Sequence, residues 1–155
     1  KKLLSRERSA IFLDGDELRE VLKSGGGGDL YSREARLNLS MQYSKICHLL
    51  ALQEFNVVIS TISLFNEIHT LNRKVLEKYF EIYLTAPKEI LESRDPKGIY
   101  AAHSRGERKN VAGLDLQIDE PINPDWKINC QDGASPSDLT EELIKRVNEK
   151  YEDTL

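Results

Sequence analysis

Four short apolar runs, separated by longer segments with helical periodicity, constrain this chain more than any other feature of its sequence. The runs cover residues 10–13, 56–61, 79–84 and 126–130. Apolar runs of this length, bounded by polar turn residues, are typical of buried parallel strands. Strands that alternate with helices form a parallel sheet covered on both faces. We therefore predict a single α/β domain over residues 1–155, with a parallel sheet flanked by helices.

The segments between these runs have the signals of helices. Asp16 is expected to cap a helix over residues 17–23, and Ser32 a helix that runs to about residue 53. Further helices are predicted from about residue 65, over residues 87–94 and from Ser135 onward, and residues 24–28 are predicted to form a flexible glycine connector. The apolar stripe of the 32–53 helix comprises Leu39, Tyr43, Ile46, Cys47 and Leu50.

The composition argues against several classes of function. The chain has 155 residues and a net charge of −4, which argues against broad attraction to nucleic acid or to an anionic membrane. No apolar run approaches the ~20 residues that span a bilayer. Cys47 and Cys130 are expected to be free thiols, which favours a reducing cytoplasm. His48, His69 and His103 lack the spacing of metal ligands, so we predict no metal site built on them.

Polar side chains follow the first strand, at the sheet edge where ligands gather in parallel folds. A carboxylate at Asp14 or Asp16 could hold magnesium through water or accept a proton from a hydroxyl group. The alternative is a helix cap at Asp16 and a solvated turn residue at Asp14. Arg19 and Arg36 lie near helix N-termini, where a cation opposes the macrodipole, so we predict a phosphate or sulfate between them. Ser63 is either part of an anion site or a simple helix cap.

A second cationic region follows residue 94. Pro96 fixes the chain and Gly98 permits a turn, so that Lys97 can reach a phosphoryl group. Residues 101–112 are predicted to form a mobile lid that excludes water during phosphoryl transfer. A solvated basic loop is the alternative for the same residues. The lid cations are Arg105, Arg108 and Lys109.

Four segments of the chain, taken in order, resemble the motifs of the adenylylsulfate kinases. They are residues 13–19, 62–63, 94–100 and 110–115. The resemblance implies a P-loop kinase fold. It also implies transfer of the γ-phosphate of ATP, with Mg²⁺, to the 3′-hydroxyl of adenylylsulfate, a step of sulfate assimilation. Catalytic roles are implied for Asp16, Ser63 and Lys97. Substrate contacts are expected at Asp14, Arg19, Tyr31, Arg36, Ile62 and Val111, and ATP contacts at Arg105 and Asn110.

The sequence departs from the family pattern at several positions. The glycine-rich phosphate loop belongs before Ile11, so we expect the chain to be a fragment that begins after it. Tyr31 and Val111 stand where the family clamps adenine between two phenylalanines, and a valine weakens stacking worth ~1–3 kcal/mol. Ala101 and Ala102 replace paired lysines of the lid.

These departures leave the base of the substrate open. Adenylylsulfate is the simplest substrate, and a pyrimidine nucleotide such as cytidine diphosphoramidate is the alternative. A different hypothesis is a catalytically inactive module that binds a nucleotide or a partner protein, and another is a kinase of an unrelated small hydroxyl compound. We expect a nucleotide as the partner, no nucleic acid and no membrane, and we leave a homodimer open.

Overall fold

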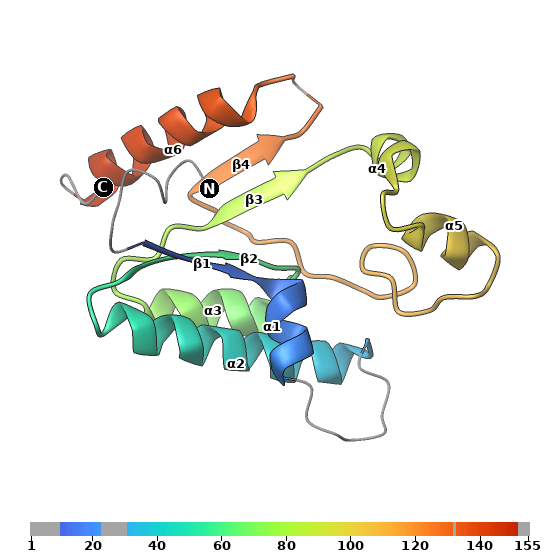
Figure 1. The fold of residues 1–155 in the computed structure, drawn as a ribbon, viewed down its shortest axis with the longest axis horizontal. Helices are drawn as coiled ribbons and strands as arrows, with labels where there is room; N and C mark the ends of the chain where they lie inside the picture. The colour runs from blue at the N-terminus through green and yellow to red at the C-terminus, as the bar shows by residue number, and fades with distance from the viewer. Residues whose placement is uncertain (1–9, 23–30, 132, 152–155) are drawn as a thin grey trace.

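The computed structural model describes residues 10–22, 31–131 and 133–151 (Figure 1). Strands and helices alternate along the chain, as predicted. The connector predicted at residues 24–28 lies outside the described residues. The elements are β1 (Ala10–Asp14), α1 (Gly15–Leu22), α2 (Arg33–Ala51), β2 (Asn56–Ser60), α3 (Asn66–Val75), β3 (Ile82–Thr85), α4 (Lys88–Arg94), α5 (Ile99–Ser104), β4 (Trp126–Asn129) and α6 (Pro136–Tyr151).

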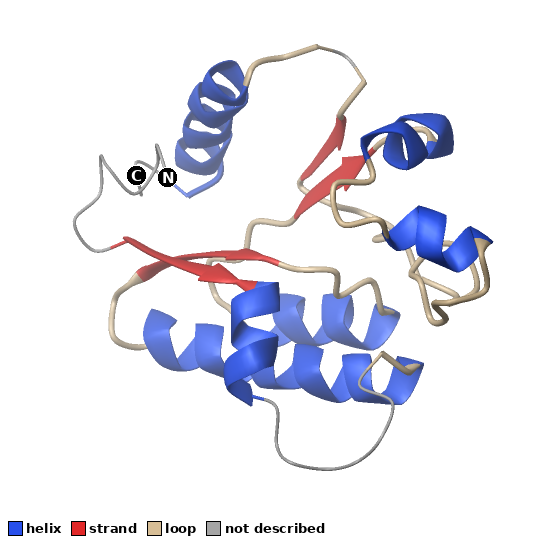
Figure 2. Ribbon diagram, turned by 45° about the vertical axis from the view of Figure 1, so that its right-hand side comes forward, coloured by secondary structure: helices blue, strands red, loops and turns tan. Residues whose placement is uncertain are grey.

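The four strands form two parallel pairs. In the first pair Ala10 of β1 lies opposite Asn56 of β2, and in the second Ile82 of β3 lies opposite Trp126 of β4. Helices α2 and α3 lie side by side along the β1–β2 pair, whereas α6 lies near the β3–β4 pair (Figures 1 and 2). The prediction of parallel strands is confirmed. The prediction of one sheet is corrected for the described residues, because β2 and β3 are not hydrogen-bonded to each other.

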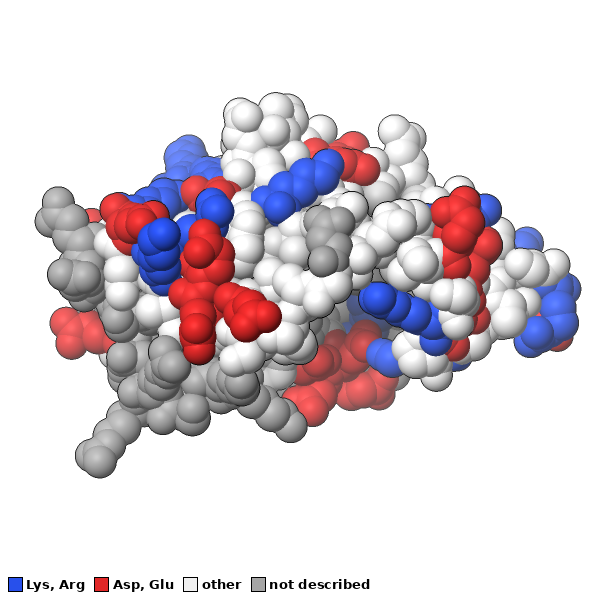
Figure 3. Space-filling model, turned by 90° about the horizontal axis from the view of Figure 1, so that it is seen from above, with Lys and Arg blue, Asp and Glu red and all other residues white. Residues whose placement is uncertain are grey.

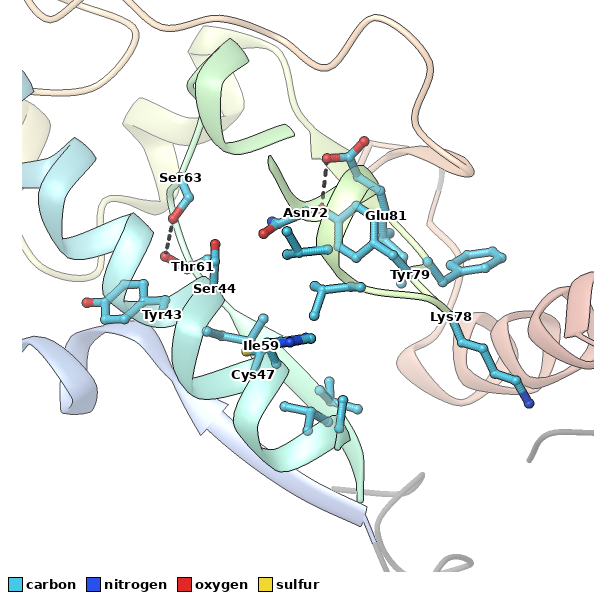
Figure 4. Close-up of a pocket in the computed structure, with 18 of the residues that line it drawn as sticks. Tyr43, Ser44, Cys47, Ile59, Thr61, Ser63, Asn72, Lys78, Tyr79 and Glu81 are labelled. Atoms are coloured by element: carbon cyan, nitrogen blue, oxygen red, sulfur yellow. Dashed lines mark hydrogen bonds between the residues drawn. The ribbon is translucent and has the colours of Figure 1, made fainter. Parts of the chain in front are cut away.

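A cavity of about 860 Å³ lies where β2 and β3 would otherwise meet. Val57 and Ile59 of β2 line it, as does Ile82 of β3, and α2 contributes Tyr43 and Cys47 (Figure 4). The cavity separates the edges of β2 and β3, which therefore lie out of hydrogen-bonding reach of each other. Both edges face a space with largely apolar walls.

The turn after β1 holds α1 in place. Oδ1 of Asp14 accepts hydrogen bonds from the N–H groups of Asp16 at 2.8 Å and Glu17 at 3.3 Å. Asp14 therefore caps α1, and the prediction that Asp16 is the cap was wrong because the helix already begins at Gly15. Gly15 packs tightly on the end of β2, since a Cβ there would lie 2.8 Å from the carbonyl oxygen of Ser60.

Strand β3 begins at Ile82, three residues later than the sequence predicted. Asp125 explains the difference, because its Oδ2 accepts the N–H of Glu81 at 2.7 Å. The carbonyl oxygen of Tyr79 accepts the hydroxyl of Tyr151 at 2.6 Å. Side chains from other elements therefore occupy the backbone groups of residues 79 and 81 that a longer strand would use for pairing.

The Glu81 side chain lies in a buried polar cluster. Its carboxylate is 2.7 Å from Nδ1 of His69 and 3.2 Å from a guanidinium nitrogen of Arg73. Asp125 lies 2.7 Å from Arg73 and also contacts Lys150. The cluster joins α3, α6 and the segments that lead into β3 and β4, so His69 has a structural role.

We expect Glu81→Ala to lower the free energy of unfolding by about 3 kcal/mol, because it removes the buried carboxylate that faces a cation. Urea denaturation measures this loss. The matched control is Glu149→Ala, which removes an exposed carboxylate 3.9 Å from Lys145 and should cost less than about 0.5 kcal/mol. Equal losses in the two variants would contradict a structural role for the Glu81 cluster.

The surface carries charges of both signs, and the two cysteines agree with the sequence-based prediction. No helix in the described ranges is long and apolar enough to cross a membrane. The face that carries α6 mixes acidic and basic side chains (Figure 3). On α6 itself, Arg146 and Glu142 lie 2.6 Å apart. Cys47 and Cys130 are free, as predicted. Burial raises the pKa of the Cys47 thiol to about 11, so this side chain acts as a packing group.

Candidate active site

Two of the predicted catalytic residues meet, although 81 positions of sequence separate them. Nζ of Lys97 donates a hydrogen bond to Oδ2 of Asp16 at 2.5 Å. Asp16 lies in the first turn of α1, beside the carboxyl end of β1, and Lys97 lies on the turn between α4 and α5. The two side chains are 63% and 65% exposed, so a ligand can reach both groups from solvent.

Asp95 fixes the turn that carries Lys97. Its carboxylate accepts the N–H groups of Ile99 at 2.7 Å and Ala101 at 3.0 Å, which joins the end of α4 to α5. These backbone hydrogen bonds hold the pKa of Asp95 below its ordinary value. Gly98 has φ 63°, a left-handed conformation that favours glycine, and this confirms the turn predicted there.

Lys97 and two arginines set the charge state of Asp16. The hydrogen bond from Lys97 is the largest cause that moves the pKa of Asp16, which lies below its ordinary value, and the charges of Arg19 and Arg36 lower it further. In turn, the hydrogen bond to Asp16 raises the pKa of Lys97. At neutral pH the site therefore presents an ionised carboxylate and an ammonium group in contact. The first can orient a hydroxyl group, and the second can counter charge on a phosphoryl group.

Arg19 lies beside Asp16 with most of its side chain covered. The side chain is 14% exposed, and one guanidinium nitrogen is 3.9 Å from Oδ1 of Asp16. The Nε of Arg19 is buried and has no hydrogen-bond partner among the described residues. A buried donor without a partner is costly. The predicted contact of Arg19 with an anionic ligand stays a prediction, and this donor is a group that such a ligand could satisfy.

Arg36 joins the start of α2 to the end of the predicted lid. Its Nε donates a hydrogen bond to the carbonyl oxygen of Tyr31 at 3.0 Å. A second guanidinium nitrogen donates a hydrogen bond to the carbonyl oxygen of Asn110, also at 3.0 Å. Asn110 has φ 59°. The N–H groups of Asn110 and Val111 donate to the Asp115 carboxylate at 2.8 and 2.7 Å. Arg36 therefore has a structural role, and its contact with substrate stays a prediction.

The two positions predicted to hold the base have different surroundings. Val111 is 6% exposed and so offers a ligand only a small apolar surface. The guanidinium groups of Arg19 and Arg36 lie over the Tyr31 ring, 5.2 and 5.4 Å from its centroid. In this structure the Tyr31 ring therefore contacts arginines.

Ser63 belongs to a group of hydroxyls next to the turn after β1. Its Oγ accepts a hydrogen bond from Ser40 at 2.8 Å. The same oxygen lies 2.9 Å from the hydroxyl of Thr61 (Figure 4). The Thr61 side chain lies 3.1 Å from the place where a Cβ on Gly15 would be. This contact places the group beside the Asp14 to Asp16 turn. Ile62 is 57% exposed, and the predicted substrate contacts at residues 62 and 63 stay predictions.

The segment predicted as a lid comprises most of α5 and the loop after it. Two nitrogens of Arg105 donate to the two carboxylate oxygens of Glu107, both at 2.8 Å. His103 lies 3.4 Å from Asp115. The contact of Arg105 and Asn110 with ATP, and the closure of residues 101–112 over the site, stay predictions.

Sequence reasoning missed several residues that position this site. Asp95 and Asp115 bind backbone N–H groups. For Asp95, an aspartate followed by a glycine turn is a recognisable signal for this role. Tyr43 was predicted only as an apolar residue, but its hydroxyl donates to the carbonyl oxygen of Gly15 at 2.7 Å. Ser40 is 2% exposed. Its contact with Ser63 depends on how α2 packs, which no local pattern reveals.

Comparisons with known proteins agree with this geometry. The family model for adenylylsulphate kinase matches residues 1–129. The cytidine diphosphoramidate kinase of Campylobacter jejuni is 37% identical over 147 residues, which cover 95% of this chain and 84% of that protein. The adenylyl-sulfate kinase of Gloeothece citriformis is 32% identical over 148 residues, covering 96% of this chain and 78% of that protein.

A solved structure is also similar over most of the chain. The structure of the Mycobacterium tuberculosis APS kinase CysC in complex with AMPPNP and APS has a TM-score of 0.82 and 32% identity, and covers 95% of this chain and 84% of that chain. The fold is therefore the P-loop kinase fold, an α/β class, as predicted. The chain belongs to the adenylylsulphate kinase family. This membership confirms the resemblance drawn from the motifs and the predicted enzyme class, a nucleotide kinase.

Proposed function

We propose that this protein transfers the γ-phosphoryl group of ATP to the 3′-hydroxyl of a nucleotide that carries an anionic group at its 5′ end. The observation that carries the proposal is the meeting of Asp16 and Lys97 at 2.5 Å, with Arg19 at 3.9 Å from the same carboxylate. A carboxylate among cations, at the carboxyl end of a parallel strand, suits the attack of a hydroxyl group on a highly charged phosphoryl group.

In the proposed step, the 3′-oxygen of the nucleotide forms a bond to the γ-phosphorus. The bond from that phosphorus to the bridging oxygen of ADP breaks, and its electron pair leaves with ADP. Asp16 orients the hydroxyl group and accepts its proton late in the step. Because Lys97 lowers the basicity of Asp16, early proton removal contributes little, which a loose phosphoryl-transfer transition state allows. Lys97 places a positive charge beside the moving group.

The described residues fit a magnesium ion held mainly by ATP. They contain no group of three or more histidine, cysteine, aspartate or glutamate side chains that could hold a metal alone. Magnesium in such sites takes one or two carboxylates, with phosphate and water oxygens completing its shell. Asp14 and Asp16 would supply those carboxylates, and the bound ion would neutralise charge on the phosphate oxygens.

The β- and γ-phosphates of ATP also need a glycine-rich loop, which the family resemblance places before Ile11. The cavity between β2 and β3 supports this placement. One more parallel strand there could pair with both free edges and end near Asp14 and Asp16. The gene sequence upstream of Lys1 is the test. A Gly-x-x-x-x-Gly-Lys-Ser/Thr motif there favours the enzyme, and a sequence without one favours a nucleotide-binding module.

Adenylylsulfate is the first candidate substrate, because it is the substrate named for the relative from G. citriformis. Cytidine diphosphoramidate is the second, supported by the 37% identity to the C. jejuni kinase and by Val111. A valine that is 6% exposed gives no aromatic face on which a purine could stack. A smaller pyrimidine loses less stacking energy than a purine when valine replaces the family's phenylalanine.

The experiment is an assay of ATP-dependent phosphorylation by the full-length protein. The substrates are adenylylsulfate, cytidine diphosphoramidate, and the 5′-diphosphates of cytidine and uridine. We expect kcat/KM for one of them to exceed the others by about 100-fold or more, because a pocket built for one base and one 5′ group leaves polar groups unpaired with another. The absence of any phosphorylated product from this panel would contradict the proposed function.

Arg19→Ala is expected to raise KM for the nucleotide roughly 10- to 100-fold, because a charge-assisted hydrogen bond to the substrate anion is lost. The midpoint of urea unfolding should stay unchanged. Arg33→Ala is the matched control. Arg33 begins α2 and pairs with Glu67 at 3.3 Å, away from Asp16. Unchanged kinetics in Arg19→Ala, or equal effects of the two substitutions, would refute the role assigned to Arg19.

A further inference from the structure

One buried tyrosine of α2 reaches the turn that carries Asp16. Tyr43 is 3% exposed, and its hydroxyl donates a hydrogen bond to the carbonyl oxygen of Gly15 at 2.7 Å. Gly15 stands between Asp14 and Asp16, and 28 positions of sequence separate it from Tyr43. The proposed reaction uses Asp16 but gives Tyr43 no part. A buried hydroxyl bound to the backbone next to a catalytic carboxylate can control where that carboxylate points.

The turn at Gly15 is also held on two other sides. Towards β2, a Cβ on Gly15 would lie 2.8 Å from the carbonyl oxygen of Ser60, so the two backbones pack closely. Within the turn, Oδ1 of Asp14 accepts the N–H of Asp16 at 2.8 Å. These contacts set the depth of the turn against β2 and begin the helix. The hydrogen bond from Tyr43 adds a fixed point on α2, which sets the angle of the turn.

The Tyr43 hydroxyl acts on this turn as a donor. Burial raises the pKa of Tyr43 above its ordinary value, the nearby Arg19 opposes the rise, and the charges of Asp16 and Asp14 add to it. The phenol therefore stays protonated at neutral pH, and its one proton is shared with the Gly15 carbonyl oxygen. The hydroxyl is held in place within electrostatic reach of the charged groups of the site, and it cannot serve as their base.

Asp16 depends on such an anchor because little else packs around its side chain. The side chain is 63% exposed, and it meets Lys97, which is equally exposed, through one hydrogen bond. Helix α1 has only eight residues, from Gly15 to Leu22, and a helix this short is marginal in water without tertiary contacts. The direction of the Asp16 carboxylate therefore follows from what holds the first turn of α1.

We infer that Tyr43 is a positioning residue for Asp16, because its hydroxyl holds the start of α1 at the angle where the Asp16 carboxylate meets Lys97. Tyr43 acts through the backbone of Gly15 and needs no contact with the nucleotide or with ATP. The inference rests on the proposed function for the catalytic role of Asp16. Its effect on the contact between Asp16 and Lys97 can be measured without any turnover.

The test is Tyr43→Phe in the full-length protein, which removes the hydroxyl and keeps the ring. The first readout is NMR titration of the Asp16 carboxyl carbon. The hydrogen bond from Lys97 lowers the pKa of Asp16, so a loosened turn should raise it, by about half or more of the rise in Lys97→Met. When Lys97→Met is already present, adding Tyr43→Phe should give no further rise, because the contact is already lost.

The second readout is kinetic. In Tyr43→Phe, kcat should fall about 10-fold, because a misplaced catalytic group slows the chemical step. KM for the nucleotide should change less than about threefold, because the loss falls on the transition state and not on ground-state binding. In an Asp16→Asn background the same substitution should lower kcat less than about twofold, since the group that Tyr43 positions has been removed.

Two control variants separate this role from a general effect on packing. Tyr151→Phe removes a hydroxyl that also donates to a backbone carbonyl oxygen, that of Tyr79 at 2.6 Å, on the α6 side of the molecule. Ser44→Ala removes a buried hydroxyl next to Tyr43, whose hydrogen bond to Ser40 stays within α2. Both should leave the Asp16 titration curve unchanged and kcat within about twofold of wild type. Urea unfolding gives the folded fraction of each variant, and the titration is read from folded signals.

Several results would overturn the inference. They are an Asp16 titration curve in Tyr43→Phe identical to that of wild type, an equal rise of the pKa in either control, an equal rise with and without Lys97→Met, and an unchanged kcat in Tyr43→Phe. The kinase assay on the wild type reports separately. If no substrate is phosphorylated but the titrations are as expected, the proposed reaction fails and the positioning of Asp16 by Tyr43 stands.

Discussion

Replacing Asp16 by asparagine is expected to lower kcat about 10³-fold, the largest effect of any single substitution in this site. The amide keeps the size of the side chain but cannot accept the proton of the 3′-hydroxyl, and it carries no charge to hold Lys97. KM for the nucleotide should change much less, because the arginines that bind its anionic group remain. Steady-state kinetics at saturating ATP measure both quantities.

Glu17→Gln is the matched control for Asp16→Asn. Glu17 is the next residue of α1 and is exposed, and its N–H donates to Asp14. The control makes the same carboxylate-to-amide change one position away from the site, so kcat should stay within about twofold of wild type. A comparable loss of kcat in both variants would show that the charge of the α1 N-terminus matters and that Asp16 has no special role.

Lys97→Met should lower kcat by about 10²–10³-fold, the second largest effect, because it removes a positive charge placed beside the transferring phosphoryl group. Methionine preserves much of the aliphatic length of lysine. The fold should be unaffected, since the Lys97 side chain is 65% exposed. Lys88→Met is the control, because Lys88 is an exposed lysine of α4 that pairs only weakly with Glu92 at 3.4 Å.

The same Lys97→Met variant tests the contact with Asp16 independently of activity. The hydrogen bond from Lys97 lowers the pKa of Asp16, so its removal should raise that pKa toward the ordinary value for aspartate. Lys97→Arg retains a cation and should keep the pKa low. Titration of the Asp16 carboxyl carbon by NMR measures the change. An identical titration curve in the wild type and in Lys97→Met would contradict the contact.

The sequence predicted the kinds of elements well, because the apolar runs and helical stripes are local patterns. The strands β1 and β2 and the caps at Ser32 and Ser135 follow from neighbouring residues. The start of β3 could not be predicted in this way. It depends on Asp125, which is 44 positions from Glu81 and binds its N–H. The division into two strand pairs likewise depends on how segments distant in sequence pack together.

The candidate site was predictable where it follows from topology. Strand ends meet at one edge of a parallel sheet, and this rule places Asp14 and Asp16 at a ligand site. The motif around Lys97 pointed to the same site through family resemblance. The sequence assigned the helix cap to Asp16, whereas Asp14 caps α1. The error arose because α1 begins at Gly15, earlier than predicted. The gathering of arginines over Tyr31 was missed because each side chain comes from a different segment.

The proposed function depends on the nucleotide 3′-hydroxyl as the group that attacks ATP. The most direct measurement compares the ribonucleotide that the full-length protein uses with its 3′-deoxy analogue, with the products identified by mass spectrometry and phosphorus NMR. We predict one added phosphate at the 3′ position of the ribonucleotide, with release of ADP, and no product from the 3′-deoxy compound. Phosphorylation of the 3′-deoxy analogue at a rate similar to that of the ribonucleotide would contradict the assignment of Asp16, Lys97 and the arginines to this reaction.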